Sequence, residues 1–525
     1  MAKLLEELDS DAGAAATIRV DPSRMRCIGS VDERFQSYNV EMVEVTGGRF
    51  WKPYSAIADM AAQDEQTPDT TEPGSQSTPT GMNPDLYMYR PPINLANSRL
   101  RAMARALAPA YMRVSGTWAN TTFFDPGDTP VLNPPEGYGA VLTRDQWLGV
   151  IEFSKFVDAP IVTSMPVGKG TRDAQGEWLP DQARRWLAFT RSNGGTIAAV
   201  EFFNEPTLAA MGGAPDDYSA ADYGRDHRSF ERMMREDQPD SLILAPGSVG
   251  EADADWSIAS GGYGGFELLL AEDLTVHTGA ADAFSYHHYG AVSRRCLPMG
   301  HQTTLEDALS EDWLGRTDQT LNYYRRVRDR FMPGKVFWNT ETAEAAGGAN
   351  PWAKSFLDTF RYIDQLGRLA RQEVAVVIHN TLAASDYGLL DEDTFLPRPN
   401  FWAALLWRRI MGTTVLDPGV ANGPGLHVYA HSLHGVSGGV AMVIVNTDRQ
   451  QERSLDLTCA ATRYTLTATN LLDEDVKLND TILRLAEDDA LPAMRGRDEP
   501  AGRVNFPAAS ITFLAMSEAA NEACG

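Results

Sequence analysis

The chain has 525 residues, of which 43% are hydrophobic and 22% are charged, and its formal net charge at pH 7 is −25. This composition is typical of a globular protein with a large core and excludes a disordered chain. The negative charge repels nucleic-acid phosphates and anionic membranes, so we expect neither as a partner. At ~150 residues per domain, the length predicts two domains unless one of them is a large barrel.

The cysteines and the N-terminal residues place further bounds on the protein. Cys27, Cys296, Cys459 and Cys524 have no paired or metal-binding spacing, so the sequence predicts neither a disulfide framework nor a zinc site. The first residues lack the apolar core of a secretion signal, and no later run reaches the ~18 apolar residues of a membrane span. We therefore expect a cytoplasmic protein that makes no membrane contact.

From about residue 31 to residue 412, short runs of β-branched and aromatic residues alternate with longer helical patterns. This alternation is typical of βα units. The predicted strands cover residues 35–45, 110–116, 159–167, 197–205, 241–248, 283–290, 335–341 and 374–380. Eight such units favour an α/β fold in which residues 31–412 form a (β/α)8 TIM barrel, with an open doubly wound sheet as the alternative.

The chain on either side of the barrel has a different pattern. Residues 413–525 contain short alternating strands separated by Gly, Asn and Asp, which predicts an all-β sandwich. Residues 1–30 include the run ATIRVDPS, and we expect this N-terminal segment to contribute a strand to that sandwich.

The connection after the first strand, residues 46–92, is predicted to be a long loop because residues 60–84 form a Gln/Thr/Pro/Ser tract without periodicity. In a barrel this connection emerges on the C-terminal face, where active sites form. The loop is therefore either a surface insertion or a wall over the site.

Two glutamates end strands on nearly opposite sides of the predicted barrel. EFFNEP places Glu205 at the end of the fourth strand, and VFWNTET places Glu341 at the end of the seventh. Facing carboxylates ~5–5.5 Å apart suit retaining glycoside hydrolysis. Burial would keep Glu205 protonated as the acid/base, and hydrogen-bond donors would keep Glu341 ionised as the nucleophile. A single glutamate at a strand end is more often an exposed cap, so it is the pair that favours the catalytic interpretation.

Neighbouring polar residues extend this candidate site. Asn204 precedes the proposed acid and is predicted to bind the sugar 2-OH. In SYHHYG, His287 and Tyr289 share one strand face, which we assign to the barrel mouth, with Tyr289 as a donor to Glu341. A core histidine beside a packed tyrosine fits the same spacing. His288 points to the other face, so the two histidines cannot share a metal, and no metal is predicted. No GxSxG motif is present, which disfavours a Ser-His-Asp hydrolase.

These residues, with KVFWNTETAEAAGG and SRLRAMARALAPAYMRVSGTWANTTFFDP, resemble glycoside hydrolase family 79, the heparanase and β-glucuronidase family. The similarity extends from about Phe35 to the C-terminus. It implies a cofactor-free retaining β-glucuronidase, with Glu205 as acid/base and Glu341 as nucleophile. It also implies that a Gly-Gly turn and a tyrosine hold the glucuronate carboxylate, since successive amides bind anions; by position these are Gly347, Gly348 and Tyr387. The other sugar-contacting residues that it implies are Glu41, Thr117, His287 and Tyr289.

Departures from the family pattern bear on the substrate. The connection FDPGDTPVLNPPEGYGAVLT is too short to hold an excisable linker, so a single chain is expected to be active. The basic clusters of heparan-cleaving relatives are largely absent, and Ala346 stands where some relatives have tyrosine.

These differences favour an exo-acting β-glucuronidase with a glucuronide substrate, in which the 46–92 loop closes the pocket and Trp51 or Tyr54 provides a stacking wall. A heparanase-like endo-β-glucuronidase acting on glycosaminoglycan chains is the alternative. A non-catalytic uronate-binding protein is a third hypothesis, from a different class.

Overall fold

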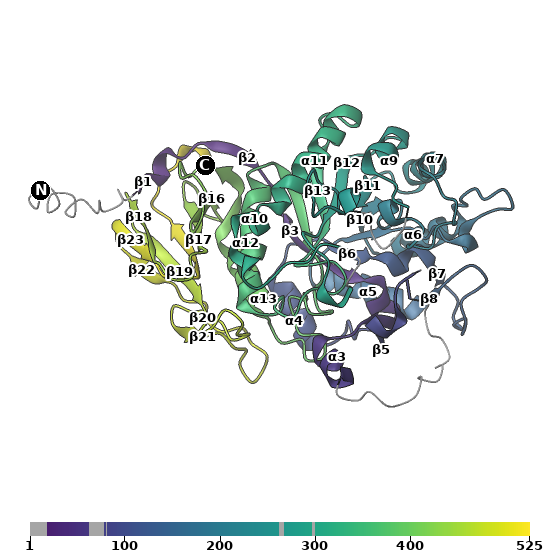
Figure 1. Cartoon of the computed structure of the whole chain (residues 1–525), viewed down its shortest axis with the longest axis horizontal. Helices are drawn as coiled ribbons and strands as arrows, with labels where there is room; N and C mark the ends of the chain where they lie inside the picture. The colour runs from purple at the N-terminus through teal and green to yellow at the C-terminus, as the bar shows by residue number, and fades with distance from the viewer. Residues whose placement is uncertain (1–17, 62–77, 80, 262–266, 297–299) are drawn as a thin grey trace, which may run out of the picture.

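The computed structural model describes residues 18–525 except 62–77, 80, 262–266 and 297–299, and it contains a barrel beside a β-sheet domain (Figure 1). Eight strands close the barrel in the order β10–β11–β12–β13–β14–β3–β6–β9, and every neighbouring pair is parallel. The strands are β3 (Gln36–Glu41), β6 (Met112–Ser115), β9 (Ile161–Ser164), β10 (Ile197–Glu201), β11 (Leu242–Val249), β12 (Ala283–His288), β13 (Val336–Thr342) and β14 (Val374–His379). The predicted TIM barrel is confirmed, and the open-sheet alternative is wrong.

Helices surround the barrel, and some of them are capped at the N-terminus by a side chain. The Thr143 and Ser219 side chains accept hydrogen bonds from the N–H groups of Gln146 and Asp222, which stabilises the first turn of two of these helices. The main helices of the ring are α4 (Ser98–Ala106), α5 (Arg144–Phe156), α6 (Asp181–Ser192), α7 (Ala220–Asp237), α9 (Ala271–His277), α11 (Arg316–Phe331), α12 (Phe356–Ala370) and α13 (Pro399–Ile410).

The interior of the barrel is filled by apolar side chains from its strands, including Val162, Leu244, Trp338 and Ile378, which form one buried cluster. Because this layer closes the barrel interior, polar side chains on the same strands gather near the carboxyl ends. The polar side chains that could bind or react with a ligand therefore lie at one face of the barrel.

The C-terminal domain is the predicted β-sandwich. One sheet contains β2 (Cys27–Ser30), β15 (Met411–Leu416), β16 (His427–Leu433), β17 (Val440–Asn446), β19 (Ala461–Thr467), β20 (Lys477–Leu478), β21 (Thr481–Ile482), β22 (Arg497–Glu499) and β24 (Ser510–Met516). The other contains β1 (Ile18–Val20), β18 (Arg453–Leu457) and β23 (Gly502–Phe506). The sequence patterns did not identify β2, β15, β20, β22 or β23; of these, β20 and β22 have two and three residues and are too short for alternation to be recognised. Two strands from the N-terminal segment, β1 and β2, thus lie one in each sheet.

The larger sheet is buried on both faces. Met442 and Ile444 of β17 pack toward the smaller sheet, whereas Val443 and Val445 pack with the barrel helices. Between the domains, the buried His427 of β16 hydrogen-bonds Asp364 of α12 at 2.5 Å. Its other nitrogen bonds Glu311 of α10 (Glu311–Leu314) at 2.7 Å. Burial lowers the pKa of His427, but the two carboxylates outweigh it and raise the value to about 9.

The long connection after β3 begins with α2 (Met42–Thr46) and contains the antiparallel pair β4 (Gly48–Trp51) and β5 (Tyr87–Arg90), with α3 (Tyr54–Ala61) between them. Most of the 60–84 tract and of the GGYGG run lies outside the described residues. Across the described ranges, no helix has both the length and the apolar character that a bilayer crossing needs.

Candidate active site

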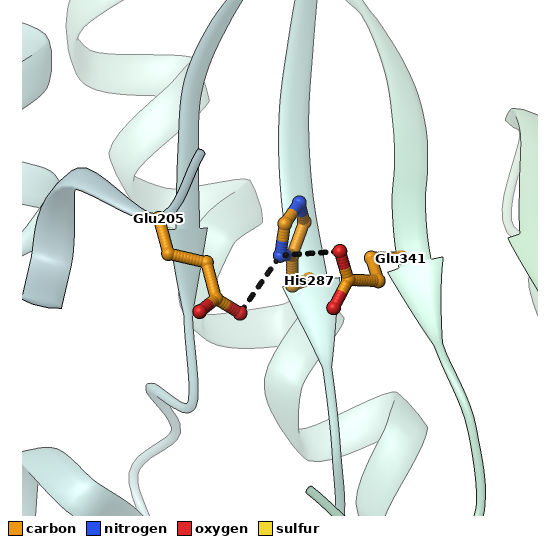
Figure 2. A group of neighbouring side chains, drawn as sticks. All are labelled: Glu205, His287 and Glu341. Carbon is orange, nitrogen blue, oxygen red and sulfur yellow. Dashed lines mark hydrogen bonds and ion pairs between the residues drawn. The ribbon is translucent and has the colours of Figure 1, made fainter. Parts of the chain in front are cut away.

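Glu205 and Glu341 lie on either side of His287, at the carboxyl ends of β10, β13 and β12, respectively (Figure 2). One carboxylate oxygen of each glutamate and Nδ1 of His287 lie within 4.8 Å of one another. The two glutamate side chains are 13% and 7% exposed, respectively. The pair is therefore close together and accessible from the cleft, while His287 is fully buried beneath it.

Glu205 follows β10 in an irregular exit and is not part of the strand. The predicted strand extended to residue 205, but β10 ends at Glu201. The side chain of Asn120 pairs with both backbone groups of Asn204, at 2.9 and 3.0 Å, in place of a neighbouring strand. Glu205 has φ 50° and ψ 62°, a left-handed conformation that is unfavourable for most residues. Because Pro206 follows, the ordinary helical conformation is also disfavoured at this position.

A buried arginine links the carboxylates at the bottom of the site, and the sequence did not predict this role. Arg113 of β6 donates to Oε2 of Glu201 from Nε at 3.0 Å and from Nη2 at 2.8 Å. Its Nη1 donates to Oε2 of Glu341 at 2.8 Å. Burial raises the pKa of Glu201, but the groups that contact it, of which Arg113 has the largest effect, together lower the pKa overall. The signal in the sequence was a charged residue within each apolar strand, in AYMRVSG and in IAAVE.

The same arginine fixes the proton on His287. Nη2 of Arg113 lies 3.3 Å from Nε2 of His287. A guanidinium only donates, so Nε2 accepts and Nδ1 carries the hydrogen. That N–H donates to Oε1 of Glu205 at 3.0 Å. Burial lowers the pKa of His287 to about 4, so the ring is neutral near pH 7.

The two glutamates have different environments. Burial raises the pKa of Glu205 to about 7, with Arg113 opposing the shift and Glu201 adding to it. Glu341 instead accepts hydrogen bonds on both oxygens, from Arg113 and, at 2.7 Å, from the hydroxyl of Tyr289. One carboxyl thus resists losing its proton, while the other is surrounded by donors to its ionised form.

Asn380, at the end of β14, connects the other side of the cleft and was also missed. Its Nδ2 lies 3.1 Å from Oε1 of Glu41, 3.0 Å from the Tyr289 hydroxyl and 3.2 Å from the Tyr387 hydroxyl. Burial, with repulsion from Glu341, raises the pKa of Glu41 well above its usual range. Oε2 of Glu41 has no hydrogen-bond partner among the described residues. Burial therefore favours the neutral form of Glu41 at the cleft wall.

The turn at Gly347 and Gly348 needs glycine at both positions. Both residues have φ of 81°, and a Cβ on Gly347 would lie 2.5 Å from Sγ of Cys296. A Cβ on Gly348 would lie 2.8 Å from the Trp51 ring. Within the described ranges, neither glycine N–H donates a hydrogen bond to the protein. The turn thus has two successive amides without a protein acceptor, and Gly347 lines the same cleft as Glu205 and Glu341.

These residues surround one cleft of about 880 Å³, including its open mouth. Of the predicted site residues, those that line it are Glu41, Thr117, Glu205, Tyr289, Glu341, Gly347 and Tyr387. Asn204, His287 and Gly348 lie immediately behind this lining. Trp51 also lines the cleft, whereas Tyr54 packs against the Arg295 guanidinium at 4.2 Å from the ring centre.

Comparisons with known proteins give distant relatives over most of the chain. Heparanase from Mus musculus is 25% identical over 492 residues, which cover 82% of this chain and 88% of the relative. Baicalin-beta-D-glucuronidase from Scutellaria baicalensis is 24% identical, with 77% and 79% covered. Heparanase-like protein 1 from Arabidopsis thaliana is 25% identical, with 69% and 66% covered. The search against family models gave no match.

Solved structures share the architecture. A GH51 arabinofuranosidase from Xanthomonas axonopodis pv. citri superposes with a TM-score of 0.60 at 14% identity, covering 94% of this chain and 98% of that one. A 4-O-alpha-L-rhamnosyl-beta-D-glucuronidase from Fusarium oxysporum gives 0.59 at 10% identity, with 95% and 99% covered. Identities this low show a common fold and no more. The sequence relatives carry the assignment: the chain is a distant homologue of the heparanases and β-glucuronidases of glycoside hydrolase family 79.

Proposed function

We propose that this protein is a retaining exo-β-glucuronidase in which Glu205 is the acid/base and Glu341 the nucleophile. The observation that carries the proposal is the pairing of two close carboxyls with opposite environments, one with a pKa of about 7 and one bound by two donors. Their oxygens lie within 4.8 Å. This fits the ~5–5.5 Å spacing of retaining enzymes and leaves no room for the water that inverting enzymes place between carboxyls about 6.5–9.5 Å apart.

The reaction proceeds in two displacements. In the first, Glu341 attacks the anomeric carbon while Glu205 gives its proton to the departing oxygen. His287 donates to Oε1 of Glu205, so the transferred proton is on Oε2. In the second, the Glu205 carboxylate takes a proton from water, which attacks the glycosyl-enzyme and releases the β-anomer.

Recognition of a uronate carboxylate is proposed for the turn beside the nucleophile. The free amides of Gly347 and Gly348 can bind an anion without a basic side chain. Burial raises the pKa of Tyr387 well above its usual range, so its hydroxyl stays protonated and can donate to the same group. The neutral carboxyl of Glu41 adds a donor for a sugar hydroxyl.

Other sugar contacts are proposed for Thr117, which lines the cleft, and for Asn204. Because Oδ1 of Asn204 accepts from Arg113, its NH2 group is the end available to the 2-OH. His287 acts through Glu205, and Tyr289 acts through Glu341.

Exo action is supported by the long connection after β3. Trp51 lies directly against Gly348, and Pro79, Met82 and Tyr87 of the same connection also line the cleft. The connection thus covers the side where the uronate carboxylate would bind. An endo-acting enzyme needs that side open for the sugar that precedes the glucuronate. The observation therefore favours an exo-acting enzyme with a closed pocket over an endo-acting enzyme with an open groove. The name of one sequence relative, a baicalin-beta-D-glucuronidase, supports the same substrate class.

The test is hydrolysis of p-nitrophenyl β-D-glucuronide beside the matched β-D-glucoside, with the first-formed sugar anomer followed by NMR. We expect cleavage of the glucuronide, preference over the glucoside and initial release of the β-anomer. Glu341→Gln should abolish turnover while binding of glucuronic acid persists. Binding without turnover by the unaltered protein would instead support a uronate-binding protein, and initial α-anomer would exclude retention.

A further inference from the structure

Several elements contribute to the lining of the cleft. The polar groups Glu41, Asn380 and Tyr387 come from β3 and from the residues that follow β14, and apolar residues of the long connection after β3 also line it. A further set comes from the end of β11 and from the connections after β10 and β11, and is called the apolar wall: Leu208, Met211, Val249, Trp256 and Ile258. No described residue of the cleft lining is lysine or arginine.

The apolar wall lies on the side of the proposed general acid. The N–H of Leu208 donates to the carbonyl oxygen of Glu205 at 2.9 Å, so the wall begins within the turn that carries the acid. The N–H of Val249 donates to Oγ1 of Thr207 at 3.2 Å and joins the next strand to this turn. A general acid stands beside the glycosidic oxygen, on the side of the leaving group. The wall therefore faces the leaving group and not the uronate.

The wall is formed before any ligand binds. The N–H of Ile258 donates to the carbonyl oxygen of Gly250 at 3.0 Å, which closes the connection after β11. Nε1 of Trp256 donates to Gln319 at 2.7 Å, so the indole offers only its apolar surface to the cleft. Four of its members are at most 9% exposed in the free protein, so little rearrangement is needed for contact.

We propose that the apolar wall is an aglycone subsite for an apolar cyclic group, aromatic or alicyclic, so that the substrates are glucuronides of phenols or alicyclic alcohols. This inference rests on the proposed function. Burying apolar ligand surface against such side chains is favourable in proportion to its area. A second sugar would place hydroxyls against groups that cannot bond them, and a sulfate would find no cation, so both are penalised.

The test compares three substrates on the full chain: β-D-glucuronyl fluoride, cyclohexyl β-D-glucuronide and a disaccharide with β-linked glucuronic acid on an uncharged hexose. The fluoride needs no aglycone subsite, so a protein inert to it would contradict the proposed function itself. Cyclohexanol is a poorer leaving group than a sugar alcohol, so electronic effects favour the disaccharide. We expect kcat/KM for the cyclohexyl compound to exceed that for the disaccharide nonetheless. The reverse order, with the fluoride hydrolysed, would overturn the aglycone inference alone.

A matched pair of variants locates the subsite. Thr and Val have nearly the same shape, and Thr has a hydroxyl where Val has a methyl group. Ile258→Thr and Ile258→Val therefore remove nearly the same volume. We expect Ile258→Thr to lower the kcat/KM ratio of cyclohexyl compound to fluoride about fivefold to tenfold relative to Ile258→Val, since one buried methyl is replaced by an unbonded hydroxyl. Met211→Gln against Met211→Leu repeats the comparison on the other connection. Equal ratios within both pairs would show that the aglycone binds elsewhere.

Discussion

Replacing Glu205 with glutamine should remove the high-pH limb of the activity profile. With a pKa of about 7, Glu205 is half protonated near pH 7. Each further pH unit then lowers the protonated fraction about tenfold. For phenyl β-D-glucuronide, whose leaving group needs the proton, kcat/KM should therefore fall about 50-fold between pH 7 and pH 9. His287 is already neutral above a pKa of about 4, so it contributes nothing to this limb.

Other acidic groups near the site also have raised pKa values, and the assay must separate them. Burial raises the pKa of Glu44 to about 8, and its Oε2 accepts from the N–H of Glu41 at 2.7 Å. Both Glu205→Gln and Glu44→Gln are measured on the phenyl glucuronide. The limb near pH 7 should be absent from the residual activity of Glu205→Gln, whereas Glu44→Gln should keep it. A limb that survives Glu205→Gln, or that lies near the ordinary carboxyl range in the unaltered protein, would refute the assignment of Glu205.

Arg113→Met should lower the free energy of unfolding by about 3–5 kcal/mol, because it leaves buried carboxylates unpaired. Arg113→Lys, the control, should lower it less. Chemical denaturation measures both variants, and a Met variant as stable as the unaltered protein would contradict a structural role for Arg113. Gly347→Ala should raise KM for glucuronides about tenfold, because the new Cβ would lie 2.5 Å from Sγ of Cys296 and displace the turn amides. An unchanged KM would show that the uronate carboxylate binds elsewhere. The folded-state pKa of His427, about 9 against an ordinary 6.5, stabilises the protein fully below pH 6.5, and about 3 kcal/mol is lost as pH rises through 9. Thermal unfolding of His427→Gln should lack that decline; a variant with the same alkaline loss would show that another group is responsible.

The backbone plan of this protein could be predicted because each βα unit is defined by local periodicity. Strands of the barrel were predicted within a few residues of their observed bounds, and Glu205 and Glu341 were identified because each follows an apolar strand. The exit of β10 was misjudged, since it depends on Asn120, which is 84 residues from Asn204 in sequence. Pairings across such separations leave no trace in local hydrophobic pattern.

Among the partners of Glu205 and Glu341, Tyr289 was predicted as a donor to Glu341, whereas Arg113 was not. Arg113 looks like a single charge in an apolar strand, and only barrel closure brings it to Glu201 and Glu341, which are 88 and 228 residues away. The apolar wall was also missed, because Leu208 and Ile258 lie in helical segments of three and four residues, which are too short for a hydrophobic period to be recognised.

What the sequence alone determined was the order of strands and helices, the second domain and the two acidic strand ends, because all of these depend on neighbours a few residues apart. What the tertiary structure decided was the chemistry: which carboxyl keeps its proton, which is bound by donors, and which part of the cleft is apolar. Those properties depend on burial and on charges from distant strands. They exist only once the barrel has closed and water has been removed from around Arg113 and its partners.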